Sequence, residues 1–575
     1  MTDSVNQPRP GKLAGHQFTF LGCLQWTVVT LLLCLGYCLS FSHHFADTLD
    51  VAGRMQSGDI RGLYEFHHLI AGLLPFWLWT GLRQAGVSIS ALSLLQLFAF
   101  VPTVATLLLV FAMLRRLEIP ALLASGATFA FATSWAFWMY VGTGRPYSTS
   151  MFFAVAAYYV ALSINENRSE KGALFRIVGA ALLVTLSCLF WLEQCFNCIG
   201  VGLLVALRPE GLTVSRRSRN LAIYTLTGII LTLAVLLSGF LYTGAVRTRD
   251  DIQHWIATGA TPPMKFDRLS VMKASYGQAA GIIYLDGLSY MINGLVRRDP
   301  RLLKIGSLPW QLTKFLLAWL LALPIYLYPI LAFRHSSREK KVILVSFTVP
   351  LLLNLIFALG FMGSDAERFL PSFGSLAVLG ALGLGRSTMQ LRWRHTLSVL
   401  PAAVLAFIAG VNLVEGALAE KHYFTGLARQ MKDAAGHAGP RDFVFFFGRD
   451  FSHTYCTMLR YYVGASYLNL SADLAFPAWD RPDWQQELTA DVARARAEGG
   501  RVFVVDRLAL GENPISAAWS EVQHPKPTVQ EVTYFLRTNF CLTPAWNIGP
   551  TAYWQLAPRT LSCSSPLAGH PKERR

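Results

Sequence analysis

The sequence predicts an α-helical polytopic membrane protein with a soluble α/β domain at its C-terminal end. Of the 575 residues, 53% are hydrophobic and only 15% are charged, and the mean hydropathy is +0.39. A soluble chain has about 25% charged residues. The deficit comes from long apolar runs that stop near residue 420. After that point, short strand-like and helix-like segments alternate.

Several apolar runs are long enough to cross a bilayer, whose hydrocarbon core needs roughly 20 residues of helix. The first is too long for a signal-peptide core and lacks a clear cleavage site, so we expect it to remain as a helix. Two shorter runs, 177–192 and 196–207, also count as crossings. The long runs are 18–39, 91–114, 121–141, 221–241, 312–333, 342–362, 369–384 and 397–418.

The short loops between these runs carry much of the net charge of +16. Basic loops remain on the cytoplasmic side of a membrane. If the N-terminus is cytoplasmic, the basic loops obey this rule only when segment 69–82 does not cross. That segment is short and contains Pro75, which suits an interfacial or re-entrant helix. The pattern also favours contact with membrane lipids and argues against nucleic acid as a partner.

This topology divides the chain into three parts with about eleven crossings. Residues 1–17 form a cytoplasmic tail, and residues 18–419 form the membrane domain, with outer loops at about 42–90 and 244–310. Residues 420–575 form an extracytoplasmic domain. We expect a bacterial inner membrane, with the C-terminal domain in the periplasm.

The C-terminal domain is predicted from strands at 441–448, 465–470, 501–506 and 552–556, and helices at 454–463, 484–498 and 529–539. Such alternation is typical of a small α/β domain. Neither a glycine-rich dinucleotide motif nor a P-loop follows a strand, so nucleotide binding has little support. We expect a scaffold or an acceptor-binding cap over the membrane site.

The nine cysteines do not form a regular framework. Cys188 lies in an apolar run and is interpreted as a small hydrophobic residue. Cys195 and Cys198 form a CxxC pair, but no second Cys or His pair accompanies them, so a zinc or redox site has little support. A disulfide between Cys541 and Cys563 is compatible with an extracytoplasmic domain, although the sequence leaves the pairing open.

The first outer loop, FSHHFADTLD onward, contains the main candidates for chemistry. Asp47 and Asp50 are three residues apart, so one helical turn would place both carboxylates on the same face. One carboxylate could accept the proton of an attacking hydroxyl, while the other orients the acceptor or helps to hold a divalent cation. The alternative is that both face water. His67 is a candidate for a phosphate contact.

Four features resemble the polytopic GT-C glycosyltransferases, which include protein O-mannosyltransferases and lipid A aminoarabinose transferases. They are the acidic pair, a histidine with a short non-crossing helix, the segment SWAFWMYVGTGRPYSTSMFF and the segment GSDAERFLPSF. The resemblance covers most of residues 15–420. Two departures stand out: the family's two prolines are missing after His67, and Arg145 replaces an acidic residue.

The resemblance implies transfer of a sugar from a polyprenyl-phosphate donor to a glycan, lipid or protein acceptor outside the membrane. It implies Asp47 as general base with Asp50 in support. The other implied contacts are Arg368 and Arg145 with the donor phosphate, Glu193 and Gln194 with sugar hydroxyls, and Trp138 and Tyr147 with the sugar or prenyl chain. Guanidinium groups fit phosphate in two-point contacts.

Two interpretations from other classes remain. A transporter or flippase would place ionisable groups near the bilayer midplane, often within repeated halves. Here the charged residues collect at helix ends, and no repeat is visible. A non-catalytic envelope assembly protein would keep the fold without the chemistry, and the atypical His67 motif favours it.

Overall fold

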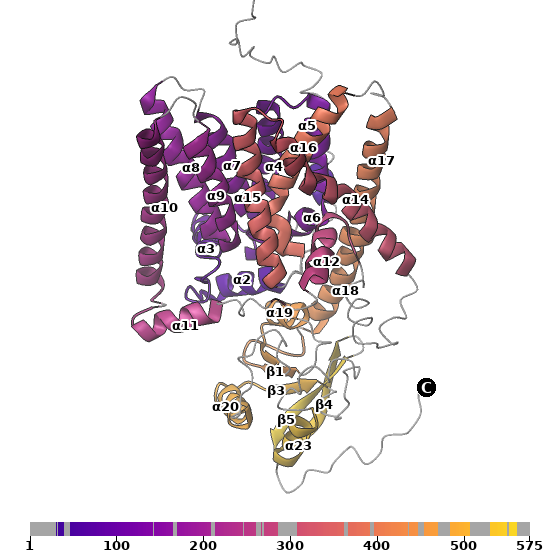
Figure 1. Ribbon diagram of the computed structural model, residues 1–575. Helices are drawn as coiled ribbons and strands as arrows, with labels where there is room; N and C mark the ends of the chain where they lie inside the picture. The colour runs from indigo at the N-terminus through magenta and orange to yellow at the C-terminus, as the bar shows by residue number, and fades with distance from the viewer. Residues whose placement is uncertain are drawn as a thin grey trace, which may run out of the picture.

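The computed structural model contains a bundle of long helices and a small sheet domain at one end of it (Figure 1). The predicted tail 1–17 and most of the first crossing lie outside the described residues. These are 30, 33–38, 46–141, 143–164, 169–208, 213–244, 246–259, 266, 270–285, 308–361, 366–390, 396–434, 436–446, 453–469, 484–505, 529–548 and 551–559.

The segment predicted to be the first outer loop contains two short helices, α2 (Ala46–Ser57) and α3 (Leu73–Gln84). The 12 residues of α3 are too few to cross a hydrocarbon core. Its Trp77 side chain is 46% exposed, which suits an interfacial position. The topology in which this segment does not cross stays a prediction.

Within the described residues, five helices are long and apolar enough to cross a membrane. They are α4 (Ala91–Arg116), α8 (Glu170–Phe190), α10 (Val214–Thr243), α14 (Leu308–Phe333) and α15 (Arg338–Gly360). Further apolar helices pack among them: α7 (Tyr147–Leu162), α9 (Cys195–Leu207), α16 (Leu370–Gln390) and α17 (Thr396–Val411). The chain is thus a multi-pass membrane protein, and the count of about eleven crossings stays a prediction.

The apolar run 121–141 was expected to form one continuous helix, but the structure divides it into two. It forms α5 (Ala121–Thr133) and α6 (Trp135–Val141), which meet at an angle of 64°. The backbone of Ser134, between them, is extended. With this bent pair counted as one span, the number of candidate crossings is six.

Asn412 satisfies backbone groups left unpaired by helix ends. It begins the π-helix η4 (Asn412–Leu418) and is fully buried. Its Nδ2 donates to the carbonyls of Thr133 (2.7 Å) and Ile282 (2.9 Å), and its Oδ1 accepts from the Tyr284 N–H (2.6 Å). These bonds join the break after α5 to the end of the short buried helix α12 (Ser270–Ile282).

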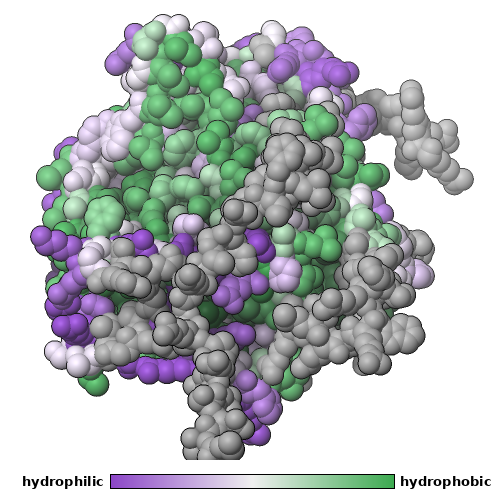
Figure 2. All heavy atoms as spheres, turned by 90° about the horizontal axis from the view of Figure 1, so that it is seen from above, coloured by the Kyte–Doolittle hydropathy of each residue, from purple (hydrophilic) through white to green (hydrophobic). Residues whose placement is uncertain are grey.

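Basic residues lie at the end of the bundle opposite the sheet domain. Figure 1 places the first turns of α10 and the last turns of α9 at this end. Those first turns carry Arg216, Arg217 and Arg219. Seen from this end, hydrophilic residues gather near the margins of a mainly hydrophobic surface (Figure 2). The sheet domain and these arginines therefore lie at opposite ends of the bundle, and their placement on opposite sides of a membrane stays a prediction.

The C-terminal domain is a five-stranded mixed sheet of order β2-β1-β3-β5-β4. The first three strands, β1 (Phe443–Phe446), β2 (Ser466–Asn469) and β3 (Val502–Val505), pair in parallel, and β5 (Thr551–Pro558) pairs antiparallel with β3 and with β4 (Phe540–Ile548). The predicted α/β pattern is confirmed, except that β4 was missed. Pro544 disturbs its alternation, and the register shifts there.

The helices of this domain are α18 (Ala419–Ala434), α19 (His453–Val463), α20 (Trp484–Ala497) and α23 (Val529–Asn539). In Figure 1, α19 faces the membrane bundle. Leu49 and Met55 of α2 belong to the same buried cluster as Met458 and Leu459 of α19. The sheet domain therefore rests directly on the helix that carries the acidic pair.

Candidate active site

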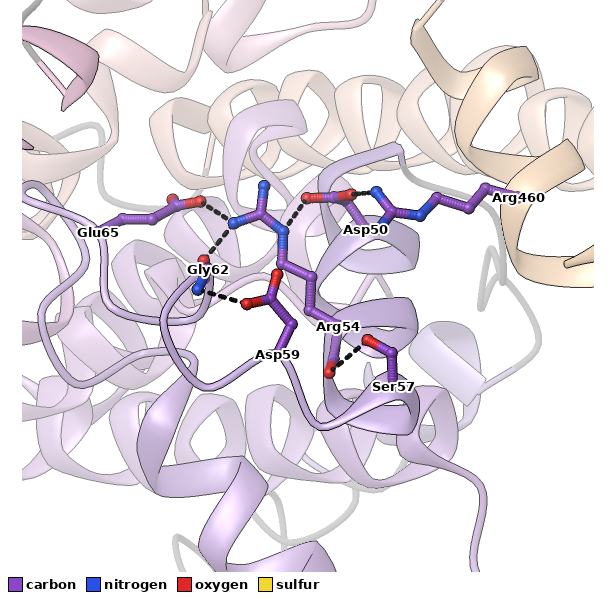
Figure 3. Close-up of polar contacts among 7 residues, drawn as sticks. All are labelled: Asp50, Arg54, Ser57, Asp59, Gly62, Glu65 and Arg460. Atoms are coloured by element: carbon purple, nitrogen blue, oxygen red, sulfur yellow. Dashed lines mark hydrogen bonds and ion pairs between the residues drawn. The ribbon is translucent and has the colours of Figure 1, made fainter. Parts of the chain in front are cut away.

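The outer loop contains a chain of ion pairs, which we call the outer-loop ion cluster: Asp50, Arg54, Glu65 and Arg460. Asp50 and Arg54 are one helical turn apart on α2, and Nε of Arg54 lies 2.7 Å from Oδ2 of Asp50. Arg54 also contacts Glu65 Oε1 at 3.1 Å, and Arg460 of α19 contacts Oδ1 of Asp50 at 3.3 Å. Figure 3 shows Arg54 between the two carboxylates. Both oxygens of Asp50 thus already contact a guanidinium.

Arg54 also organises the turn that follows α2. Its guanidinium donates to the carbonyl of Gly62, whose own N–H donates to Asp59 Oδ1 (2.9 Å; Figure 3). Partial burial disfavours the charged guanidinium, but the carboxylates of Asp50, Glu65 and Asp59 outweigh this effect and raise the pKa of Arg54. Arg54 is therefore a fixed positive charge in the centre of the loop.

Asp47 lies in the first turn of α2, three residues before Asp50. Its side chain is outside the described part of the structure. The neighbouring Thr48 and Leu49 are buried, at 2% and 1% exposed. The helix observed here has the spacing that places Asp47 and Asp50 on one face.

A second cluster of charges lies where several helices end, and we call it the arginine–carboxylate cluster: Arg145, Glu193, Glu367 and Arg368. Arg145 precedes α7, Glu193 lies in the 3-10 turn η2 (Leu192–Gln194), and the other two lie in η3 (Ala366–Phe369). Their side chains are between 8% and 15% exposed. The two arginines and two glutamates compensate one another, as partly buried charges require.

The pairs within this cluster form a continuous series. Arg368 contacts Glu193, and its Nη2 lies 2.9 Å from Glu367 Oε1. The other oxygen of Glu367 lies 3.7 Å from Arg145 and accepts a hydrogen bond from the Tyr140 hydroxyl (3.1 Å). Glu367 therefore stands between the two arginines that were predicted to bind phosphate.

Aromatic rings form one side of this cluster. Tyr147 is 2% exposed and packs against Tyr140, Trp191 and His68, with ring centroids 4.8, 4.3 and 5.9 Å away. The Arg145 guanidinium lies 4.8 Å from the Tyr147 ring centroid, a cation–π contact. Tyr147 therefore connects Arg145 to a group of packed aromatic rings.

The two clusters are joined by the segment between Glu65 and His68. These residues form a backbone bridge, with the His68 N–H donating to the Glu65 carbonyl at 3.1 Å. The N–H of Leu192, next to Glu193, donates to the carbonyl of His67 (3.1 Å). The acidic helix α2 is therefore connected to the arginine–carboxylate cluster through one short stretch of backbone.

The remaining predicted residues occupy different surroundings. Gln194 is fully buried; its Oε1 accepts from Asn197 (2.6 Å), and its Nε2 lies 3.0 Å from Met151 Sδ. The His67 ring packs against His68, at 4.7 Å between centroids. Trp138 is 6% exposed and packs edge-on against Tyr37. The structure thus brings Arg145, Tyr147, Glu193 and Arg368 together and places Trp138 in a core contact.

Sequence reasoning missed several members of the two clusters. Glu367 was part of the segment GSDAERFLPSF and Arg54 is four residues after Asp50, so both had a local signal. Arg460 had none, because 410 residues separate it from Asp50. Within the described residues, no three His, Cys, Asp or Glu side chains form a group that could hold a metal ion. With both oxygens on guanidiniums, Asp50 does not offer a free carboxylate for a cation.

Comparison with known proteins gives a structural likeness only. No protein-family model and no curated protein matches the sequence. The fold is similar to the crystal structure of ArnT from Cupriavidus metallidurans in the apo state, with a TM-score of 0.56 at 10% identity, over 93% of this chain and 98% of that one. The same protein bound to undecaprenyl phosphate matches with a TM-score of 0.53 at 11% identity, over 93% and 97%.

A second kind of protein also matches. The Archaeoglobus fulgidus oligosaccharyltransferase, in complex with Zn and sulfate, has a TM-score of 0.50 at 12% identity, over 91% of this chain and 72% of that one. At these identities the likeness concerns the fold. It extends over both the helix bundle and the sheet domain, because nearly the whole chain is covered.

Proposed function

We propose that this chain, which has the fold of the GT-C membrane glycosyltransferases, transfers a sugar from a polyprenyl-phosphate donor to an acceptor outside the membrane. The observation that carries the proposal is the convergence of Arg145 and Arg368, from separate elements, beside the aromatic residues around Tyr147. Two guanidiniums at a helix-end site suit a lipid phosphate. The structurally similar ArnT binds undecaprenyl phosphate, which supports a polyprenyl carrier.

In the proposed reaction, the acceptor hydroxyl oxygen attacks the anomeric carbon of the donor. The bond between that carbon and the phosphate oxygen breaks, and its electron pair leaves with the phosphate. Arg145 and Arg368 would stabilise the negative charge that develops on this leaving group. The hydroxyl proton passes to a carboxylate in the outer loop.

We assign this carboxylate to Asp47. Both oxygens of Asp50 contact guanidinium groups, which suits a residue that positions the loop. Glu193 and Glu367 hold Arg368 in place before donor binding, because they contact it from two sides. We propose that Tyr147 packs against the donor.

We also propose that the sheet domain is extracytoplasmic, in the periplasm of a bacterial cell. Cys541 is disulfide-bonded, and such bonds persist in oxidising compartments. The basic first turns of α10 lie at the opposite end of the bundle, where the cytoplasm is expected.

The test compares Asp47→Asn, Asp50→Asn and Arg368→Gln in membranes supplied with a radiolabelled polyprenyl-phosphate sugar. Asp59→Asn is the matched control, because it removes a carboxylate of the same loop that accepts from the Gly62 N–H and has no proposed role in the transfer. We expect Asp47→Asn to lower kcat by about 100-fold or more, as loss of a general base does. We expect Arg368→Gln to raise KM for the donor as well.

Normal transfer by Asp47→Asn at wild-type protein levels would show that the base is assigned wrongly. A wild-type protein that moves the lipid-linked sugar across proteoliposomes but never transfers it would instead support the transporter interpretation.

A further inference from the structure

Three cysteines flank the turn that carries Glu193. Cys188 lies near the end of α8, and Cys195 and Cys198 lie in the first turn of α9. The sulfur atoms of Cys188 and Cys198 are 3.4 Å apart. The CxxC spacing in the sequence would pair Cys195 with Cys198, whereas the fold brings Cys188 to Cys198.

The three thiols differ in access. Cys195 is exposed, while Cys188 and Cys198 are partly buried. Cys195 and Cys198 are three residues apart on α9, which places them on neighbouring positions of one helix face. Cys195 is thus the thiol that the protein covers least, at the start of α9, and Cys198 is the neighbour of both other cysteines.

These thiols lie toward the side of the bundle that carries the outer loop. The N–H of Leu192, between the two cysteine-bearing helices, donates to the carbonyl of His67 in that loop. Cys541, in the domain that rests on the same loop, is already disulfide-bonded. A disulfide at Cys541 is compatible with the oxidising compartment proposed above for this side.

We propose that Cys188 and Cys198 are a redox-active pair that closes to a disulfide, with Cys195 as the thiol through which oxidation enters. The oxidant is a disulfide compound of the outer compartment. The Cys195 thiolate attacks that disulfide and releases one carrier thiol, leaving a mixed disulfide. Cys198 attacks the Cys195 sulfur and releases the second carrier thiol.

Cys188 then attacks the Cys198 sulfur and releases Cys195 as a thiolate. The carrier disulfide has gained two electrons and two protons, and the Cys188 and Cys198 thiols have lost the same number. The product joins the end of α8 to the start of α9. The turn Leu192–Gln194 is then closed into a covalent loop, which restricts the movement of Glu193, the partner of Arg368.

The test uses full-length protein in membranes, reduced with dithiothreitol, then treated with oxidised glutathione and blocked with N-ethylmaleimide. Peptide mass mapping should find a Cys188–Cys198 link in the wild type. Cys195→Ser should slow its formation by tenfold or more with oxidised glutathione, yet form the same link with the small oxidant diamide. Cys34→Ser, a membrane-helix cysteine outside the trio, should behave as wild type.

In Cys188→Ser, the exchange should stop at the Cys195–Cys198 disulfide or at a glutathione adduct of Cys195. The proposal is overturned if Cys188 remains fully alkylated in the wild type after both oxidants. It is equally overturned if only a Cys195–Cys198 link forms there. Because the mapping needs no sugar transfer, its result is independent of the proposed enzymatic function.

Discussion

Removal of the Arg54 guanidinium should loosen the whole first outer loop. In Arg54→Met, Asp50 and Glu65 lose their shared partner, and the Gly62 carbonyl loses its donor. Methionine keeps most of the side chain's volume, so packing changes little. Hydrogen bonds to charged groups are worth about 1.5–3 kcal/mol each at best, and the side chains of Arg54 and Asp50 are 25% and 16% exposed. We expect a local loss of about 2 kcal/mol.

Hydrogen exchange of peptides covering residues 46–70, measured by mass spectrometry in detergent or nanodiscs, reads this loss directly. A change of about 2 kcal/mol corresponds to ~30-fold faster exchange in this segment. The segment is favourable for the measurement because its amides bond locally, for example the Leu63 N–H to the Asp59 carbonyl at 3.2 Å.

Two variants make the test specific. Arg460→Met removes a contact whose arginine is 42% exposed, so solvent screening should limit its effect to about 0.2–1 kcal/mol. Arg83→Met removes an exposed arginine of α3 that packs on Trp79 and should leave residues 46–70 unchanged. If Arg54→Met exchanges at the wild-type rate, or if Arg460→Met equals it, the assignment of Arg54 as the organising charge is refuted.

Three further predictions concern stability. Asn412→Leu should lower the thermal stability of the solubilised protein by roughly 3 kcal/mol, because it removes the partner of one buried and two partly buried backbone groups. Asn539→Leu, at an exposed helix end, should cost far less in the same fluorescence melt. Gly200→Ala should be destabilising by about 1–3 kcal/mol, since a Cβ would lie 2.4 Å from the Ser346 carbonyl, whereas Gly126→Ala has open space and should be neutral in a denaturant titration. Burial tends to raise the pKa of Asp442, but hydrogen bonds from Arg501 and Gly439 outweigh this effect and lower the pKa below its ordinary value of 3.8. The ionised carboxylate should therefore stabilise the sheet domain fully above about pH 3.8, and this stabilisation should disappear as the pH falls below that value. Asp442→Asn should flatten this part of the domain's pH–stability curve.

The class of protein and the positions of most elements could be predicted from the amino-acid sequence. Apolar runs near 20 residues and alternating strands and helices are local patterns, so helices such as α15 and α23 begin and end close to their predicted bounds. The bend at Ser134 had no comparable signal. It depends on Asn412, far along the chain, to satisfy the Thr133 carbonyl.

The candidate site was determined only in part by sequence. Arg145, Tyr147, Glu193 and Arg368 were selected from separate segments, and packing brings them together. The segment GSDAERFLPSF placed Glu367 beside Arg368, but only packing shows that it also lies beside Arg145. A residue's partners at long range depend on how helices pack, and packing leaves no periodic pattern in the chain.

Two further contacts could not be predicted from the sequence and follow from how helices are placed against one another. Arg460 reaches Asp50 because the hydrophobic faces of α19 and α2 pack together. Cys188 reaches Cys198 because α8 and α9 are joined by a tight turn that brings the end of one helix beside the start of the next. Composition and periodicity report which faces are apolar, whereas the choice of partner depends on the shape of both surfaces.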